Sequence, residues 1–299
     1  MSISVPAAEM GGLRSRRSGF ASLVALARQK YLGAISAAVI LVFLFVAVAG
    51  PVIAPYDPID VDPPGALAAP SPAHWFGTDH LGRDVLSRII YGTRISLAVG
   101  VGAVVVSTVF GILIGLLSAY FGGMVDMVLQ RFIDAWQAFP GLLLALAIVA
   151  TLGPSVINVI LAISLSGLAF KARLVRGTAL SIMQAQYIDA ARAIGASDLR
   201  IMALYVLPNC WAPIIVVASI TLGAAILTES SLSFLGLGPP PPTPSWGGML
   251  SGSARSYMNT APWLALAPGL SITIVVLAFN LLGDALRDIL DPRLRNTGP

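Results

Sequence analysis

The chain has 299 residues, of which 57% are hydrophobic and only 11% are charged, which is too few charges to cover a soluble globule of this size. Its net charge of +4 gives no reason to expect a nucleic-acid partner, because the basic residues follow membrane topology instead. A bilayer core is about 30 Å thick, so a spanning helix needs about 20 mostly apolar residues.

Charge-free stretches of sufficient length occur along the whole chain. They are residues 31–56, 95–125, 135–170, 201–228 and 256–283. The third is too long for one crossing, and Gly153, Pro154 and Ser155 near its middle predict a turn that divides it into two helices. The sequence therefore predicts an all-α polytopic membrane protein with about six transmembrane helices.

The positions of lysine and arginine predict the orientation, because these residues stay on the cytoplasmic side of short loops. With the amino terminus inside, all but four of the eighteen basic residues are cytoplasmic. The four outside are Arg83, Arg88, Arg94 and Arg255. Both termini are then predicted to be cytoplasmic.

The segment between the first two predicted spans begins with many proline and aspartate residues, which indicates an extended external loop. Residues 84–94 then have an amphipathic pattern, with apolar residues such as Val85 and Ile89 on one helical face. This pattern is compatible with a helix at the outer membrane interface. It is equally compatible with the first turns of the second span.

Glycine and proline mark two further features of the predicted fold. Gly111 and Gly115 have the spacing that lets helix backbones approach closely, and packing within the chain is favoured over a dedicated dimer face. A second external loop is predicted between Glu229 and Trp263. It contains the proline run 239–242, which indicates either a docking surface or a stiff connector.

The chain lacks residues that several kinds of chemistry require. Neither Lys30 nor Lys171 follows a glycine as in a phosphate-binding loop, so no nucleotide site, cofactor or enzymatic activity is expected here. His74 and His80 are expected to be solvated loop residues rather than metal ligands. A proton-coupled carrier usually keeps charged residues within its spans, whereas the predicted spans of this chain contain none. This indicates that transport is driven from outside the spans.

The longest predicted cytoplasmic loop, residues 171–208, has the pattern of a helix, a glycine break and a second helix. Gly195 supplies the positive φ that ends the first helix. Ser197 can cap the second, and Asp198 in its first turn complements the helix dipole. Pro208 is expected to stop this second helix before the fifth span. On these grounds alone the hairpin either rests at the interface or docks a soluble partner.

The spacing within this loop is similar to a known motif. Asp189-Ala190-Ala191, Gly195 six positions later and the closing Leu207-Pro208 resemble the coupling motif of permeases in binding-protein-dependent ABC importers. The usual motif has Glu where this chain has Asp189, and an aliphatic residue where it has Tyr205. The resemblance implies an ATPase-coupling loop formed by Tyr187, Asp189, Ala190, Ala191, Arg192, Gly195, Ser197, Asp198, Leu207 and Pro208.

Further motifs narrow the resemblance to the dipeptide and oligopeptide permeases, in their second-permease branch. These are residues 54–58 (APYDP), 76–79 (FGTD), 81–88 (LGRDVLSR), 92–97 (GTRISL), 232–238 (LSFLGLG), Trp246-Gly247, 284–288 (DALRD) and Asp291-Pro292. The resemblance covers residues 31–295 and implies the type I ABC importer permease fold.

The resemblance also implies how the chain is organised and what it binds. Its parts are a cytoplasmic tail at 1–30, a first transmembrane helix at 31–56, an external loop at 57–92, a five-helix permease core at 93–284 and a cytoplasmic tail at 285–299. The implied partners are a second homologous permease in a heterodimer, two ATPase domains that bind ATP and magnesium, an external solute-binding protein and membrane lipid. The implied location is a bacterial inner membrane.

The implied solute is a peptide or a similar small polar molecule. Nickel complexes, glutathione and opines remain alternatives, because relatives with this pattern carry them. A secondary transporter is a remote alternative, since the predicted spans lack charges. Polar residues in the spans, such as Asn158, Thr221 and Asn280, either line the pathway or satisfy neighbouring backbone groups, and the second role is favoured.

Overall fold

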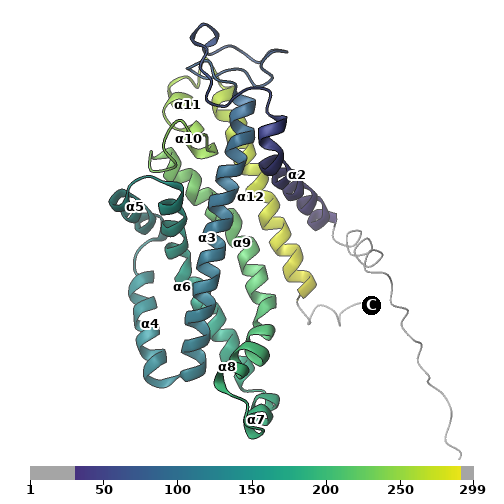
Figure 1. Cartoon of the computed structure of the whole chain (residues 1–299), viewed down its shortest axis with the longest axis vertical. Helices are drawn as coiled ribbons and strands as arrows, with labels where there is room; N and C mark the ends of the chain where they lie inside the picture. Colours follow the sequence, from purple (N-terminus) through teal and green to yellow (C-terminus); the bar gives the residue numbers. More distant parts are fainter. Residues whose placement is uncertain (1–30, 291–299) are drawn as a thin grey trace, which may run out of the picture.

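A computed structural model of the chain describes residues 31–290, which form an elongated helical bundle (Figure 1). The two predicted cytoplasmic tails lie wholly or mostly outside the described residues, as do Asp291 and Pro292. Within the described residues the secondary structure is helical and contains no β-strand, so the predicted all-α class is confirmed.

Five long helical segments are apolar enough to cross a membrane. They are α2 (Tyr31–Ile53), α3 (Val85–Phe121), α6 (Val156–Met183), α8 to α9 (Asp198–Ile201 and Leu207–Phe234) and α12 (Trp263–Leu290). A sixth candidate is the pair α4 (Gly123–Gln137) and α5 (Gly141–Leu152), which meet at 86°. The predicted number of about six is therefore confirmed.

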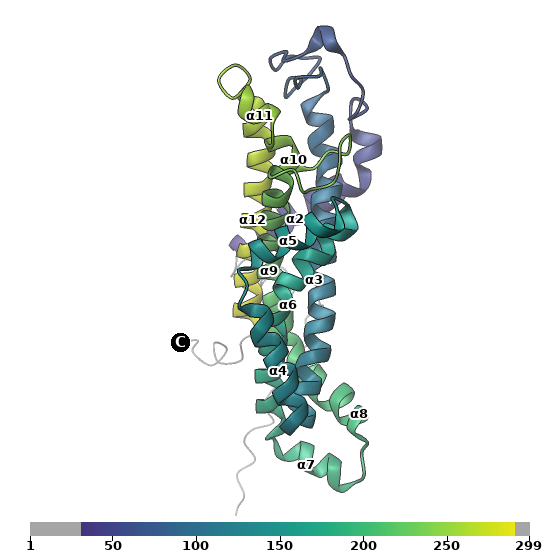
Figure 2. The same ribbon diagram turned by 90° about the vertical axis from the view of Figure 1, so that its left-hand side faces the viewer.

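Short elements connect the long helices at the end of the bundle opposite α7 (Gln186–Ala193). These are the 3₁₀ turn η1 (Pro63–Gly65), α10 (Trp246–Leu250) and α11 (Ser253–Ser256). We call the two ends of the molecule the α7 end and the α11 end (Figures 1 and 2).

The turn predicted inside residues 135–170 is present, but the helix before it differs from the prediction. Gly153 has a φ of 86°, and Ser155 caps α6 by accepting a hydrogen bond from the Asn158 backbone N–H at 3.1 Å. The expected single helix from Ala135 to this turn is wrong, because the chain bends sharply before Pro140. Proline lacks an N–H and disfavours helical geometry in the residue before it, so α4 and α5 are separate helices.

The first turns of the second span account for residues 84–94. Asp84 is the N-cap of α3, where its Oδ2 accepts the Ser87 backbone N–H at 2.7 Å. The same helix then continues to Phe121, so no separate interfacial helix forms. Likewise α9 continues to Phe234, and the external loop predicted from Glu229 begins later than expected.

The predicted spans at 135–170 and 201–228 contain no charge, but α6 and α9 continue past their predicted ends and bury the charged residues that follow. Lys171 is 4% exposed in α6, where its Nζ donates to Val104 O at 3.1 Å and to Ser107 Oγ at 2.6 Å. Glu229 is fully buried in α9, where its Oε1 accepts from Ser233 Oγ at 2.7 Å. Hydroxyl and carbonyl groups replace the water that these side chains lose, which is the condition for burying them.

Other polar side chains settle alternatives that the sequence left open. Asn158 Nδ2 donates to Leu152 O at 3.0 Å and to Gly153 O at 2.9 Å, and Thr221 Oγ1 donates to Val217 O at 2.8 Å. These two residues therefore satisfy backbone carbonyls, as was favoured.

The expectation that both histidines are solvated is wrong, because His80 Nδ1 is buried and because His74 contacts an aspartate. His74 Nδ1 lies 3.0 Å from Asp84 Oδ1, and the His74 side chain is 24% exposed. The described residues contain no group of three His, Cys, Asp or Glu suited to a metal.

Close helix packing in the bundle involves Gly111 and Gly115 of α3, which face α6. A Cβ atom on Gly115 would lie 2.6 Å from Ala172 O, and one on Gly111 would lie 2.8 Å from Lys171 Cβ. The glycine spacing thus serves contact within this chain, as predicted. It lets α3 lie against α6 at a distance that no larger residue permits.

Gly115→Ala is expected to destabilise the protein by about 1–3 kcal/mol, because the new methyl group meets rigid backbone. Gly269→Ala in α12 is the matched control, since a Cβ there meets nothing within 4 Å. That change is expected to stabilise by about 0.5–1 kcal/mol through the better helix propensity of alanine. Thermal unfolding in detergent measures both, and shifts of the same sign would contradict the assigned packing.

Candidate functional site

The candidate coupling loop lies at the α7 end of the molecule. Figure 2 shows α7 lying across the long axis, beyond the ends of the long helices. The predicted loop of residues 171–208 is shorter than expected, because α6 continues to Met183 and α8 begins at Asp198. The chain between those helices contains α7 and the turn that follows it.

The predicted glycine break after α7 is confirmed. Gly195 has a φ of 79°, and its N–H donates to Arg192 O at 2.9 Å. The Ala196 N–H donates to Ala191 O at 3.1 Å, which completes a left-handed helix cap of the type that glycine favours. The direction in which the chain leaves α7 therefore depends on the backbone freedom of one glycine.

Ser197 is the N-cap residue of α8 as predicted, although its side chain makes no capping hydrogen bond. Asp198 is in the first turn, where its Oδ1 accepts the Tyr120 hydroxyl at 2.6 Å. This bond joins the end of α3 to α8. No local pattern in the sequence indicates it, because the two residues are 78 positions apart.

The predicted stop at Pro208 is wrong. A π-helical segment, Met202–Val206, joins α8 to α9, and the Leu207 N–H donates back to Met202 O. Pro208 therefore lies in the first turn of α9, where a missing N–H costs least. The wider π turn accommodates the proline without ending the helix, so the second helix of the hairpin continues directly into a long span.

One face of α7 is anchored in the bundle. Ile188 is fully buried and Ala191 is 3% exposed, and Ile188 belongs to an apolar cluster with residues of α3, α6, α8, α9 and the π-helical segment. The other members are Leu116, Ala119, Val175, Ala179, Ile201, Val206, Cys210 and Ile214. A displacement of α7 would therefore press on several long helices through close-packed side chains.

The opposite face is open and combines charge with apolar surface. The Asp189 side chain is 72% exposed, and Arg192 Nη1 lies 3.4 Å from its Oδ1. Ile194 and Leu199 are 81% and 73% exposed. Exposed apolar side chains beside charged ones are typical of a surface that contacts another protein.

The structure brings most of the predicted site residues onto this surface. Those exposed are Tyr187, Asp189, Ala190, Arg192, Gly195, Ser197, Asp198 and Pro208, while Leu207 is half-buried and Ala191 is buried. The sequence did not single out Leu199, whose exposure becomes visible only once its helix is placed.

Residues 111–296 match a family described as the binding-protein-dependent transport system inner membrane component. Residues 20–70 match the N-terminal TM domain of oligopeptide transport permease C. A similar curated protein is the dipeptide transport system permease protein DppC of Alkalihalophilus pseudofirmus, which is 45% identical over 85% of this chain and 83% of its own length. The glutathione transport system permease protein GsiD of Pectobacterium atrosepticum is 49% identical over 76% of this chain and 75% of its own.

A solved structure has the same fold. It is the MetNI methionine ABC transporter in an inward-facing conformation, matched with a TM-score of 0.55 and 17% identity over 68% of this chain and 96% of that one. The likeness confirms the predicted type I importer architecture.

Proposed function

Because this chain belongs to the family of binding-protein-dependent transport system inner membrane components, it is a permease of an ABC importer of the dipeptide or glutathione type, and we propose that α7 and the Gly195 turn dock a separate ATPase. One observation carries this proposal: α7 has one face buried in the helix bundle and the other exposed to a partner. Such an element transmits force between two proteins.

In this proposal the α7 end and both termini of the chain are cytoplasmic. The α11 end faces outward, toward the solute-binding protein. ATP binding closes the ATPase pair, which displaces α7 and, through Ile188, the long helices. ATP hydrolysis itself belongs to the partner subunits.

A second permease completes the pathway in a heterodimer. We propose peptides as the solute. Glutathione is the second candidate, because a relative named for glutathione transport is 49% identical to this chain.

Cysteine labelling can test which end of the molecule is cytoplasmic. The sole cysteine of the chain, Cys210, is fully buried and therefore does not compete with an introduced thiol. A cysteine placed at Ile194 or Trp75 therefore carries the reactive thiol of its variant, since these positions are 81% and 70% exposed. In intact spheroplasts, a membrane-impermeant maleimide is expected to label Trp75→Cys and not Ile194→Cys. In inverted vesicles stripped of peripheral proteins, the pattern is expected to reverse.

The same variants test ATPase docking. Adding the purified ATPase to stripped inverted vesicles is expected to slow labelling of Ile194→Cys at least about tenfold, because a docked protein covers the thiol. Met124→Cys, which is 72% exposed at the start of α4, is the control for a position outside α7. Labelling of Ile194→Cys from the outside, or at an unchanged rate with ATPase bound, would refute the proposal.

A further inference from the structure

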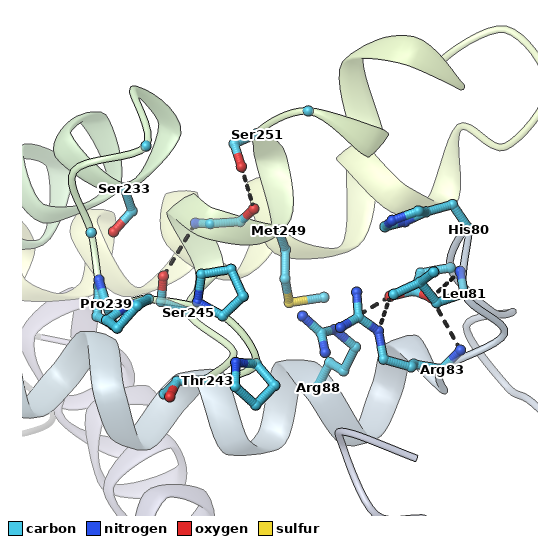
Figure 3. Close-up of a pocket in the computed structure, with 18 of the residues that line it drawn as sticks. His80, Leu81, Arg83, Arg88, Ser233, Pro239, Thr243, Ser245, Met249 and Ser251 are labelled. Carbon is cyan, nitrogen blue, oxygen red and sulfur yellow. Dashed lines mark hydrogen bonds and ion pairs between the residues drawn. The ribbon is translucent and has the colours of Figure 1, made fainter. Parts of the chain in front are cut away.

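A pocket of about 390 Å³ lies at the α11 end, far from the coupling surface (Figure 3). Its walls come from the loop before α3, the first turn of α3, the proline run and α10. One side is apolar, formed by Pro240–Pro242, Met249 and Leu264. A concave hollow of this size that combines an apolar wall with converging polar groups is typical of a small-molecule site.

The polar side of the pocket carries an excess of positive charge. Arg83 and Arg88 both line it, and their side chains are only 11% and 9% exposed. Asp79 is the one acidic residue among the lining residues. Its Oδ2 lies 2.7 Å from Arg83 Nε and 3.6 Å from Arg88 Nε, so two guanidinium groups share one carboxylate oxygen.

Asp79 has no capacity left to neutralise the second arginine. Its Oδ1 accepts the backbone N–H groups of Leu81 at 2.8 Å and Arg83 at 3.0 Å. The next acid along the chain, Asp84, is engaged by His74 and by the N-terminus of α3. One guanidinium charge therefore stays uncompensated in a nearly buried position, which is costly without an anion.

The free donors point to one place. Within the described residues, both Nη atoms of Arg83 lack a protein partner, whereas Arg88 donates one Nη to Pro58 O at 2.9 Å. His80 also lines the pocket, and its buried Nδ1 has no hydrogen-bond partner. Figure 3 shows the two guanidinium groups side by side, opposite the sulfur of Met249.

We propose that this pocket binds the carboxylate of a small apolar or peptide-like solute, with Arg83 and Arg88 holding the anionic group and the proline–Met249 wall covering the remainder. Planar guanidinium groups match a carboxylate through paired N–H donors. The choice of solute rests on the proposed function, and the permease itself then distinguishes free carboxylates from neutral analogues.

Binding of alanylalanine is the test, measured by calorimetry on the importer complex in nanodiscs without solute-binding protein or ATP. Wild type is expected to bind the dipeptide at least tenfold more tightly than its carboxamide. Arg83→Gln is expected to remove that preference, and Arg83→Lys to restore part of it. Arg94→Gln, an exposed arginine on the same helix, is the matched control and should keep it.

A second variant separates binding from folding. Met249→Glu places a carboxylate opposite the two arginines, so it is expected to keep or raise the melting temperature while abolishing dipeptide binding. Equal affinity for dipeptide and carboxamide would overturn the proposal. A second result would also overturn it: wild type binds neither the dipeptide nor its carboxamide, and Arg83→Gln blocks docking of the solute-binding protein. The pocket would then bind an acidic side chain of that protein.

These outcomes are independent of ATPase docking at the α7 end. A failure to bind dipeptide leaves the protection of Ile194→Cys unchanged, and a failure of that protection leaves dipeptide binding measurable. The two proposals therefore fail separately.

Discussion

Asp189→Lys is expected to abolish ATP-driven uptake while the permease remains folded in the membrane. The Asp189 side chain is 72% exposed and contacts Arg192 at 3.4 Å, so its replacement costs the isolated permease little, within about 0.5 kcal/mol. In the complex, an ATPase surface complementary to the acidic Asp189 carries positive charge, and the introduced lysine is repelled by it. Reversing one interfacial charge is expected to weaken association by about 10- to 100-fold, or roughly 1.4–2.8 kcal/mol.

The measurement is ATP-dependent uptake in proteoliposomes, together with co-purification of the ATPase. Asp189→Glu is the matched control, because it keeps the charge and supplies the residue that the resembling motif usually has. Asp60→Lys, an equal charge reversal at an exposed position of the α11 end, controls for net charge. Normal uptake by Asp189→Lys would show that α7 is not part of the surface that docks the ATPase.

Gly195→Val is the second change with a large expected effect. Gly195 has a φ of 79°, and a Cβ atom there meets no atom within 4 Å, so the main cost is backbone strain. That strain is about 1–2 kcal/mol for an ordinary residue and more for a β-branched one. The turn is expected to relax by changing the direction of the chain after α7. Coupling is then expected to fall at least about tenfold, since a strain above 1.4 kcal/mol shifts the turn by that factor.

A graded series separates strain from side-chain bulk. Gly195→Asn is expected to retain most coupling, because asparagine tolerates left-handed backbone. Gly177→Val is the control, since Gly177 is also exposed and free of neighbours but lies in helical geometry within α6. Uptake and ATPase stimulation should follow the order wild type, Asn, Val at position 195. Equal activity across the series would mean that the conformation of this turn does not matter for coupling.

The site illustrates which features a sequence can reveal. The Gly195 break and the turn at residues 153–155 were predicted correctly, because each depends on hydrogen bonds between residues fewer than six positions apart. Pro208 was misjudged, because a π turn several residues earlier changed what a proline costs there. The bond between Tyr120 and Asp198 had no local signal at all.

Composition and local patterns determined that this chain is an all-helical membrane protein with about six spans and a helix–glycine–helix element, while its identity as a permease came from resemblance to a known family. They are sufficient because hydrophobicity and local backbone preference act on neighbouring residues. Only the tertiary structure decided that Lys171 and Glu229 are buried in long helices and that Arg83 and Arg88 share one carboxylate. The free energy of a buried charge depends on the groups placed around it, and those groups come from helices distant in the sequence.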